Sequence, residues 1–232
     1  MGVSGLRPKN TTNTRYEILQ CATKLFLEKG YTDAYVTAIA KSLQISTGNL
    51  TFWFPTKEHI LAELVRELFA FQWKTEENEQ DLLASYLFEL VLIASVCDEN
   101  TNAKDLILAV YTQPLSIAIV REYDAKRAQK IFGAYCEGWT ETDFVLAENV
   151  ASGIERAMLM TENTEGVTFE QRVASSLDAI MKLYDVPTDD RKRLLAEVMA
   201  TDYRSKGRHV FEEFCSFVGD KMLVRTELKN RV

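Results

Sequence analysis

Glycine and proline are scarce in this chain of 232 residues, which has only ten Gly and four Pro. Because these two residues interrupt helices most strongly, their scarcity favours long helices. The four cysteines are widely spaced, none forms a Cys-x-x-Cys pair, and there are only two histidines. This composition gives no zinc-type cluster, so we expect no metal and no other cofactor.

Long apolar runs are also missing. No segment approaches the ~18 apolar residues that a membrane span requires, and the amino-terminal sequence MGVSGLRPKNTTNT has no apolar signal core. The sequence contains no Gly-rich phosphate loop and no nucleophile with a recognisable base. We therefore expect a cytoplasmic protein that is not an enzyme and has no membrane partner.

The charge is unevenly distributed. Charged residues make up 26% of the chain, hydrophobic residues make up 47%, and the net charge is −7. These values are those of an ordinary globular protein. Residues 1–60 hold seven Lys or Arg against four Asp or Glu, a net of +3, so the remainder carries −10. The amino-terminal part is thus the better candidate for binding a polyanion, although charged faces are usually only solvated surface.

Residues 36–60, VTAIAKSLQISTGNLTFWFPTKEHI, predict two short helices joined by a tight turn. Val36, Ile39, Ala40 and Leu43 form the apolar face of the first helix, and Ser46 is a side-chain cap for the second. This is a helix-turn-helix pattern, in which the second helix presents a compact polar surface without negative charge. Such a surface can enter the major groove of DNA.

The candidate DNA-binding residues come from this motif and its flanks. Lys57 stands at the start of the next helix, where its ammonium could meet a phosphate. Arg15 lies in the first turn of the preceding helix, and an ordinary solvent-exposed arginine is the alternative there. The full candidate set is Arg15, Thr37, Ser46, Thr47, Gly48, Asn49, Thr51, Phe52, Trp53 and Lys57.

The same stretch, with the helix before it, closely resembles the amino-terminal domain of TetR-family transcriptional regulators. The residues that carry the resemblance are Ile18, Leu19, Ala22, Leu25, Phe26, Gly30, Tyr31, Ile39, Ala40, Ile45, Ser46, Gly48, Leu50, Trp53, Phe54, Lys57 and Glu58. The resemblance implies a dimeric, ligand-responsive repressor that binds a palindromic operator in double-stranded DNA. It covers about the first quarter of the chain.

Three positions depart from the family pattern. Tyr35 stands where a Thr or Ser cap is usual, Gln44 where Gly commonly serves the turn, and Thr51 where Tyr is usual. These departures leave an alternative open, in which a helical adaptor keeps the fold and acts through protein contacts with weakened DNA binding.

The expected fold is all-α, a three-helix helix-turn-helix head joined to a larger helical body. We predict a flexible basic arm at residues 1–13, the head at residues 14–57, and an effector-binding and dimerisation body at residues 58–232. The candidate ligand-lining residues are aromatic side chains for which core packing is the alternative role: Trp73, Tyr86, Phe88, Tyr111 and Trp139.

Two adjacent body helices have narrow apolar faces that could pair with their copies in a homodimer, as the resemblance implies. The candidate interface residues are Ala147, Ala151, Ile154, Met158, Val173, Leu177 and Ile180. Packing within one subunit is the alternative. Two further helices are expected after Pro187, and the sequence suggests no function for them.

Overall fold

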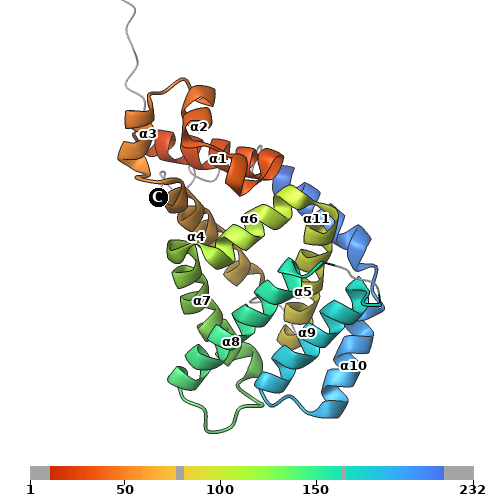
Figure 1. Cartoon of the computed structure of the whole chain (residues 1–232). Helices are drawn as coiled ribbons and strands as arrows, with labels where there is room; N and C mark the ends of the chain where they lie inside the picture. Colours follow the sequence, from red (N-terminus) through yellow and green to blue (C-terminus); the bar gives the residue numbers. More distant parts are fainter. Residues whose placement is uncertain (1–10, 77–80, 163–165, 217–232) are drawn as a thin grey trace, which may run out of the picture.

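The computed structural model describes residues 11–76, 81–162 and 166–216, and these residues form eleven α-helices. Figure 1 shows a small head formed by α1 to α3 at one end of an elongated helical body, with α4 running from the head into the body. The expected all-α fold is confirmed.

The head consists of α1 (Thr11–Asp33), α2 (Val36–Ser42), α3 (Thr47–Trp53) and the start of α4 (Lys57–Glu76). Residues 11–13, which were predicted to end the amino-terminal arm, are helical and belong to α1. The rest of the predicted arm, residues 1–10, lies outside the described residues. The head core is built from the apolar side chains expected from the sequence: Ile18, Leu19, Ala22, Phe26, Ile39, Ala40, Leu50, Phe54, Ile60 and Leu61.

Helix α1 is interrupted at Gly30. Gly30 has φ 81° and ψ 161°, a conformation that is essentially restricted to glycine. Asp105 of α6 holds the corner that follows. Its carboxylate accepts hydrogen bonds from the Thr32 amide at 2.6 Å and from the Thr32 hydroxyl at 2.8 Å. The side-chain amide of Asn102, also on α6, donates to the Glu28 carbonyl at 2.7 Å. The body therefore terminates the first helix of the head.

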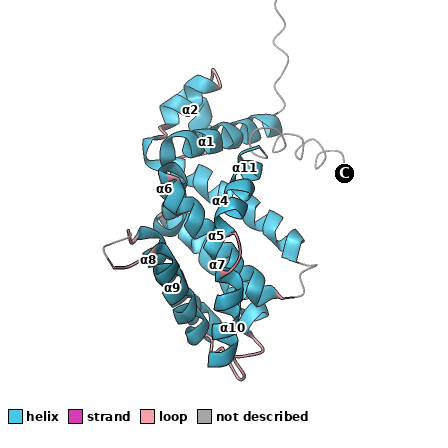
Figure 2. Ribbon diagram, turned by 90° about the vertical axis from the view of Figure 1, so that its right-hand side faces the viewer, coloured by secondary structure: helices cyan, strands magenta, loops and turns pink. Residues whose placement is uncertain are grey.

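The body is a bundle of five helices together with the remainder of α4. They are α5 (Leu82–Glu99), α6 (Thr101–Thr112), α7 (Pro114–Phe132), α8 (Glu141–Met160) and α9 (Phe169–Leu183). Side chains cap the starts of several of these helices: Asn100 caps α6, and Thr140 forms a capping box with Asp143 at α8. Helices α8 and α9 pack side by side along one side of the body (Figure 2).

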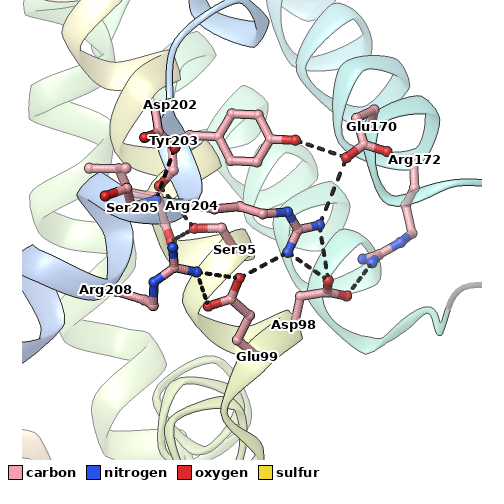
Figure 3. A network of polar contacts seen from close by, with 11 residues as sticks. Ser95, Asp98, Glu99, Glu170, Arg172, Asp202, Tyr203, Arg204, Ser205 and Arg208 are labelled. Atoms are coloured by element: carbon pink, nitrogen blue, oxygen red, sulfur yellow. Dashed lines mark hydrogen bonds and ion pairs between the residues drawn. The ribbon is translucent and has the colours of Figure 1, made fainter.

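The two carboxy-terminal helices, α10 (Thr188–Met199) and α11 (Tyr203–Ser216), confirm the expected pair after Pro187. Helix α11 packs on α5, and a Cβ atom at Gly207 would lie 2.5 Å from the Ser95 hydroxyl oxygen of α5. Figure 3 shows that Asp98 and Glu99, at the end of α5, form ion pairs with arginines of α11 and α9. Because Arg204 contacts both of these acids and also Glu170, the network links three helices.

Among the described residues, no single helix is long and apolar enough to cross a membrane. Helices α6 and α7 together have the length and apolar composition of a span, but they are bent by 78° relative to each other.

Replacing Gly30 with Ala is expected to destabilise the protein by about 1–3 kcal/mol, because the position requires a glycine-only backbone conformation. The new Cβ atom would also lie 2.7 Å from the Asp105 carboxylate. Urea denaturation measures the loss. Gly48→Ala is the matched control: it is helical, its Cβ atom meets only the Ser46 hydroxyl oxygen at 3.9 Å, and it should not lower stability. Equal stabilities of the two variants would contradict the prediction.

Candidate functional site

The turn between α2 and α3 fixes the angle of the second helix. Gln44 has φ 55°, its amide donates to the Lys41 carbonyl at 3.1 Å, and the Ile45 amide donates to the Ala40 carbonyl at 3.0 Å. This pair of bonds is a Schellman motif, which usually has glycine at its left-handed position. Gln44 therefore adopts the conformation that the sequence predicted it would tolerate less well than glycine. Gln44 in this left-handed conformation lowers the stability of the fold by about 1–2 kcal/mol relative to glycine, but both hydrogen bonds of the motif form.

Ser46 caps α3, as predicted, since its hydroxyl oxygen accepts from the Asn49 amide at 3.1 Å. Leu50 is fully buried beneath the helix. Thr51 and Trp53 are half-buried, and the Thr51 hydroxyl donates to the Gly48 carbonyl at 3.2 Å. The predicted DNA-binding residues that are exposed on α2 and α3 or cap α3 are Thr37, Ser46, Thr47, Gly48, Asn49 and Phe52.

This surface carries no acidic residue. Between residues 34 and 56 the only charged side chain is Lys41, on the last turn of α2. The absence of carboxylates is notable in a chain with a net charge of −7. A face that is polar, apolar or basic, and nowhere acidic, can approach a polyanion without charge repulsion.

Arg15 and Lys57, the two cations predicted to meet phosphates, make contacts within the protein. Arg15 pairs with Glu63 of α4 at 2.7 Å, which raises the pKa of its guanidinium, and it lies over the Phe54 ring. The Lys57 ammonium donates to the Tyr31 and Thr32 carbonyls at 2.7 and 3.2 Å. Burial lowers the pKa of Lys57. Both side chains therefore fasten α4 to α1, a role that the sequence analysis missed.

Two glutamates that the sequence analysis did not single out lie buried in the body. Glu148 and Glu155 are seven residues apart on the inward face of α8, and each is only 4% exposed. The Tyr86 and Tyr111 hydroxyls donate to the two oxygens of Glu155, both at 2.7 Å, and the Tyr184 hydroxyl donates to Glu148 at 3.1 Å. These five residues, the buried carboxylate cluster, join α5, α6, α8 and the end of α9.

The charge balance around the buried carboxylate cluster affects its protonation. Burial, together with the charges of Glu155 and Asp124, raises the pKa of Glu148 well above its ordinary value, whereas Arg127 opposes the rise. Burial also raises the pKa of Glu155, against the effect of the two tyrosine hydroxyls. Arg127 pairs with Glu89 and lies over the Tyr86 ring, so this arginine of α7 faces the interior of the body.

The five candidate ligand-lining aromatics do not share one site. Tyr86 and Tyr111 meet at Glu155. Phe88 lies beneath the Lys206 ammonium of α11, and Trp139 packs near Phe144 and Tyr184. The Trp73 side chain lies outside what the structure describes. Trp139 also lines a cavity of about 540 Å³ on the outside of α8 and α9, with Leu146, Val150 and Leu183 among its other lining residues.

The residues predicted for the dimer interface pack inside a single chain, which was the alternative. Their inward position follows from the register of the two helices, because their apolar stripes lie in the core of the body, where α8 packs against α5, α6 and α7, and α9 packs against α5, α8 and α10. The corrected positions, all buried or half-buried within the core of the body, are Ala147, Ala151, Ile154, Met158, Val173, Leu177 and Ile180.

The geometry defines a helix-turn-helix head with an acid-free outer face, joined to a helical body. The sequence profile described as "Bacterial regulatory proteins, tetR family" matches residues 18–64, which cover α2 and α3 and their supports. Residues 18–64 therefore form an amino-terminal domain of the kind found in TetR-family regulatory proteins.

Two relatives are similar to the chain over part of their length. The chain is 25% identical over 114 residues to the probable HTH-type transcriptional regulator YttP of Bacillus subtilis (strain 168), covering 47% of this chain and 55% of the relative. It is 39% identical over 54 residues to the HTH-type transcriptional regulator HbdR of Aromatoleum sp. (strain CIB), covering 23% and 24%. The chain thus spans about half of the first relative and a quarter of the second.

Among solved structures, TylP, a TetR regulator from Streptomyces fradiae, aligns with a TM-score of 0.49 at 16% identity over 88% of this chain and 99% of that chain. A gamma-butyrolactone receptor described as an ArpA-like protein aligns with a TM-score of 0.45 at 14% identity over 85% of this chain and 100% of that chain.

Over the described residues, no group of three or more His, Cys, Asp or Glu side chains is placed to hold a metal ion.

The buried carboxylate cluster predicts a pH dependence of stability. Because the folded protein raises the pKa of Glu148 and Glu155, their contribution is complete below the ordinary carboxyl pKa of about 4.3 and is lost as the pH rises through the raised values. Glu155→Gln cannot ionise, so the free energy of unfolding of the wild-type protein should fall relative to this variant as the pH rises above the ordinary carboxyl pKa.

Urea denaturation at several pH values measures this difference. Glu197→Gln, which removes a carboxylate from an exposed ion pair with Arg193 on α10, is measured beside it as the control. A flat difference for Glu155→Gln would show that Glu155 ionises normally in the folded protein.

Proposed function

We propose that the protein is a DNA-binding transcriptional regulator, which binds a palindromic operator as a homodimer and releases it in response to a small molecule. The observation that carries this proposal is the acid-free outer surface of α2 and α3, held by the Schellman turn and the Ser46 cap. A helix presented in this way fits the major groove. The family profile over residues 18–64 and the two partial relatives, both transcriptional regulators, also support a DNA-binding regulator.

Asn49 is the best candidate for direct reading of a base. Its backbone amide is already used by the Ser46 cap, and its side chain is exposed in the middle of the outer face of α3. A carboxamide can donate to and accept from an adenine edge in the major groove. Because Arg15 and Lys57 are engaged within the protein, Lys41 and backbone groups are better candidates for phosphate contacts.

The outer face of α8 supports a homodimer. Of the nine large hydrophobic side chains that are exposed among the described residues, four lie on this helix: Val145, Leu146, Val150 and Met160. Gly153 lies between them, and a Cβ atom there would meet nothing within 4 Å, so a second helix could come close. The small exposed residues Ser175 and Ala179 of α9 extend the surface. Two copies related by a twofold axis would bury these groups.

A route for the response to an effector runs through α6. Near its end, Tyr111 donates to Glu155 of the buried carboxylate cluster, and near its start, Asp105 and Asn102 hold the corner of α1. A ligand that rearranged the cluster would therefore move the helix that positions the head. Since two recognition helices must lie ~34 Å apart to enter successive major grooves, a small movement would lower DNA affinity.

The adaptor alternative is weaker. The helix-turn-helix motif forms despite the departures at Gln44 and Thr51, and its outer face carries no acidic residue.

Binding of DNA would place the protein in the cytoplasm, where we propose that it acts.

The proposal is tested first by selecting sequences from random double-stranded DNA with the purified chain. We expect enrichment of a palindrome whose affinity falls as salt rises. Asn49→Ala should bind the enriched DNA about tenfold or more weakly, since a good base contact contributes about 1–3 kcal/mol. Gln129→Ala, an exposed change on α7, is the matched control. Enrichment of no sequence by the folded chain would refute the proposal.

The dimer is tested by placing a charge on α8. Val150, 52% exposed, lies in the centre of the proposed interface, and Val150→Asp should produce a monomer because a buried unpaired carboxylate is costly. Val210→Asp, at a similarly exposed valine on α11, is the control that should leave the mass unchanged. Sedimentation of both variants measures the mass, and a dimeric Val150→Asp protein would place the interface elsewhere.

A further inference from the structure

Phe52 is the most exposed large hydrophobic side chain among the described residues, with 79% of its surface accessible. The ring packs edge-on against Trp53, at 5.4 Å between ring centres and an interplanar angle of 86°. Trp53 is itself half-buried in the head. Phe52 is therefore supported on one side by the protein while most of its surface faces outward, an arrangement that the packing of the chain does not require.

Gly48, one turn before Phe52 on α3, leaves the helix surface flat beside the ring. The residue is helical, and its φ lies outside the positive region that calls for glycine. A Cβ atom there would have ordinary contact with the Ser46 hydroxyl oxygen at 3.9 Å and with nothing closer. The fold would thus accept alanine, which has the higher helix propensity. Folding therefore does not require glycine at position 48. The absence of a side chain there instead lets another molecule come closer to the surface of α3.

The surroundings of Phe52 favour a nucleic acid over an apolar protein surface. The exposed side chains near it on α3 are Thr47 and Asn49, and no acid occurs between residues 34 and 56. This charge pattern complements a polyanion. Among the groups on the base edges of the major groove, the C5-methyl of thymine is the apolar one, and apolar side chains such as Phe contact it.

We propose that Phe52 reads the C5-methyl group of a thymine, and that Gly48 provides the space for α3 to approach the groove closely enough. This inference rests on the proposed function and makes it more specific: each half-site of the operator contains a thymine whose methyl group contributes to affinity. Asn49 lies between the two residues in sequence and would contact a neighbouring base pair.

The test replaces single thymines of the selected operator with uracil, which removes only the methyl group. We expect one symmetric position at which uracil weakens wild-type binding about fourfold per half-site, the effect of removing one buried methyl-sized group. Phe52→Ala should bind thymine and uracil operators equally. Phe52→Leu, which keeps an apolar side chain, should retain part of the difference.

Gly48→Ala provides an independent readout. It should fold with at least wild-type stability, but it should bind the operator about tenfold more weakly, since an added methyl in a close interface costs about 1–3 kcal/mol. Val210→Ala on α11 is the control for Phe52→Ala, because it also removes an exposed apolar side chain but lies outside α3.

Two failures are distinguishable. If the protein binds a palindrome in a salt-dependent manner but uracil has no effect at any position, Phe52 does not read a methyl group, and the proposed function stands. If no DNA sequence is enriched, the inference and the proposed function both fail. Wild-type affinity for Gly48→Ala would overturn the role of Gly48 alone.

Discussion

The position of the head on the body depends on one polar corner, where Asp105 of α6 binds the amide and hydroxyl of Thr32 just after the interruption at Gly30. A helix end leaves backbone groups without partners, and here a different part of the chain supplies some of them. The Lys57 ammonium binds two carbonyls of the same corner. The end of α1 is therefore held by α6 of the body and by α4, the helix that runs from the head into the body. The head cannot turn without changing these hydrogen bonds.

Helix α6 connects this corner to the least ordinary part of the core. Its Tyr111 hydroxyl donates to Glu155, and Glu155 also accepts from Tyr86 of α5. A carboxylate in an apolar core is costly unless it is hydrogen-bonded, protonated or paired. The tyrosines provide the hydrogen bonds, and burial raises the pKa of both glutamates. Tyr111 therefore joins this polar core to the helix that holds the head.

The sequence predicted the all-α fold and the helix-turn-helix motif with its Ser46 cap, because these depend on local periodicity and on side chains that act within one turn. It did not predict the corner at Asp105 or the internal roles of Arg15 and Lys57, which depend on contacts between distant parts of the chain. Glu148 and Glu155 could have been found, since they share the stripe of Ala151 and Met158 on α8. The register that turns this stripe inward also explains why the predicted dimer face lies within the chain.

The distribution of polar and apolar groups in this protein is inverted at two places, and the two inversions have different physical consequences. In the body, two carboxyl groups are buried where hydrocarbon would be more stable, which makes the core responsive to charge. In the head, Phe52 is exposed where a polar residue would be better solvated. Neither helps the isolated chain to fold. The exposed ring gains free energy only when another molecule covers it, and on an acid-free helix the best-matched cover is the methyl-bearing floor of a DNA groove.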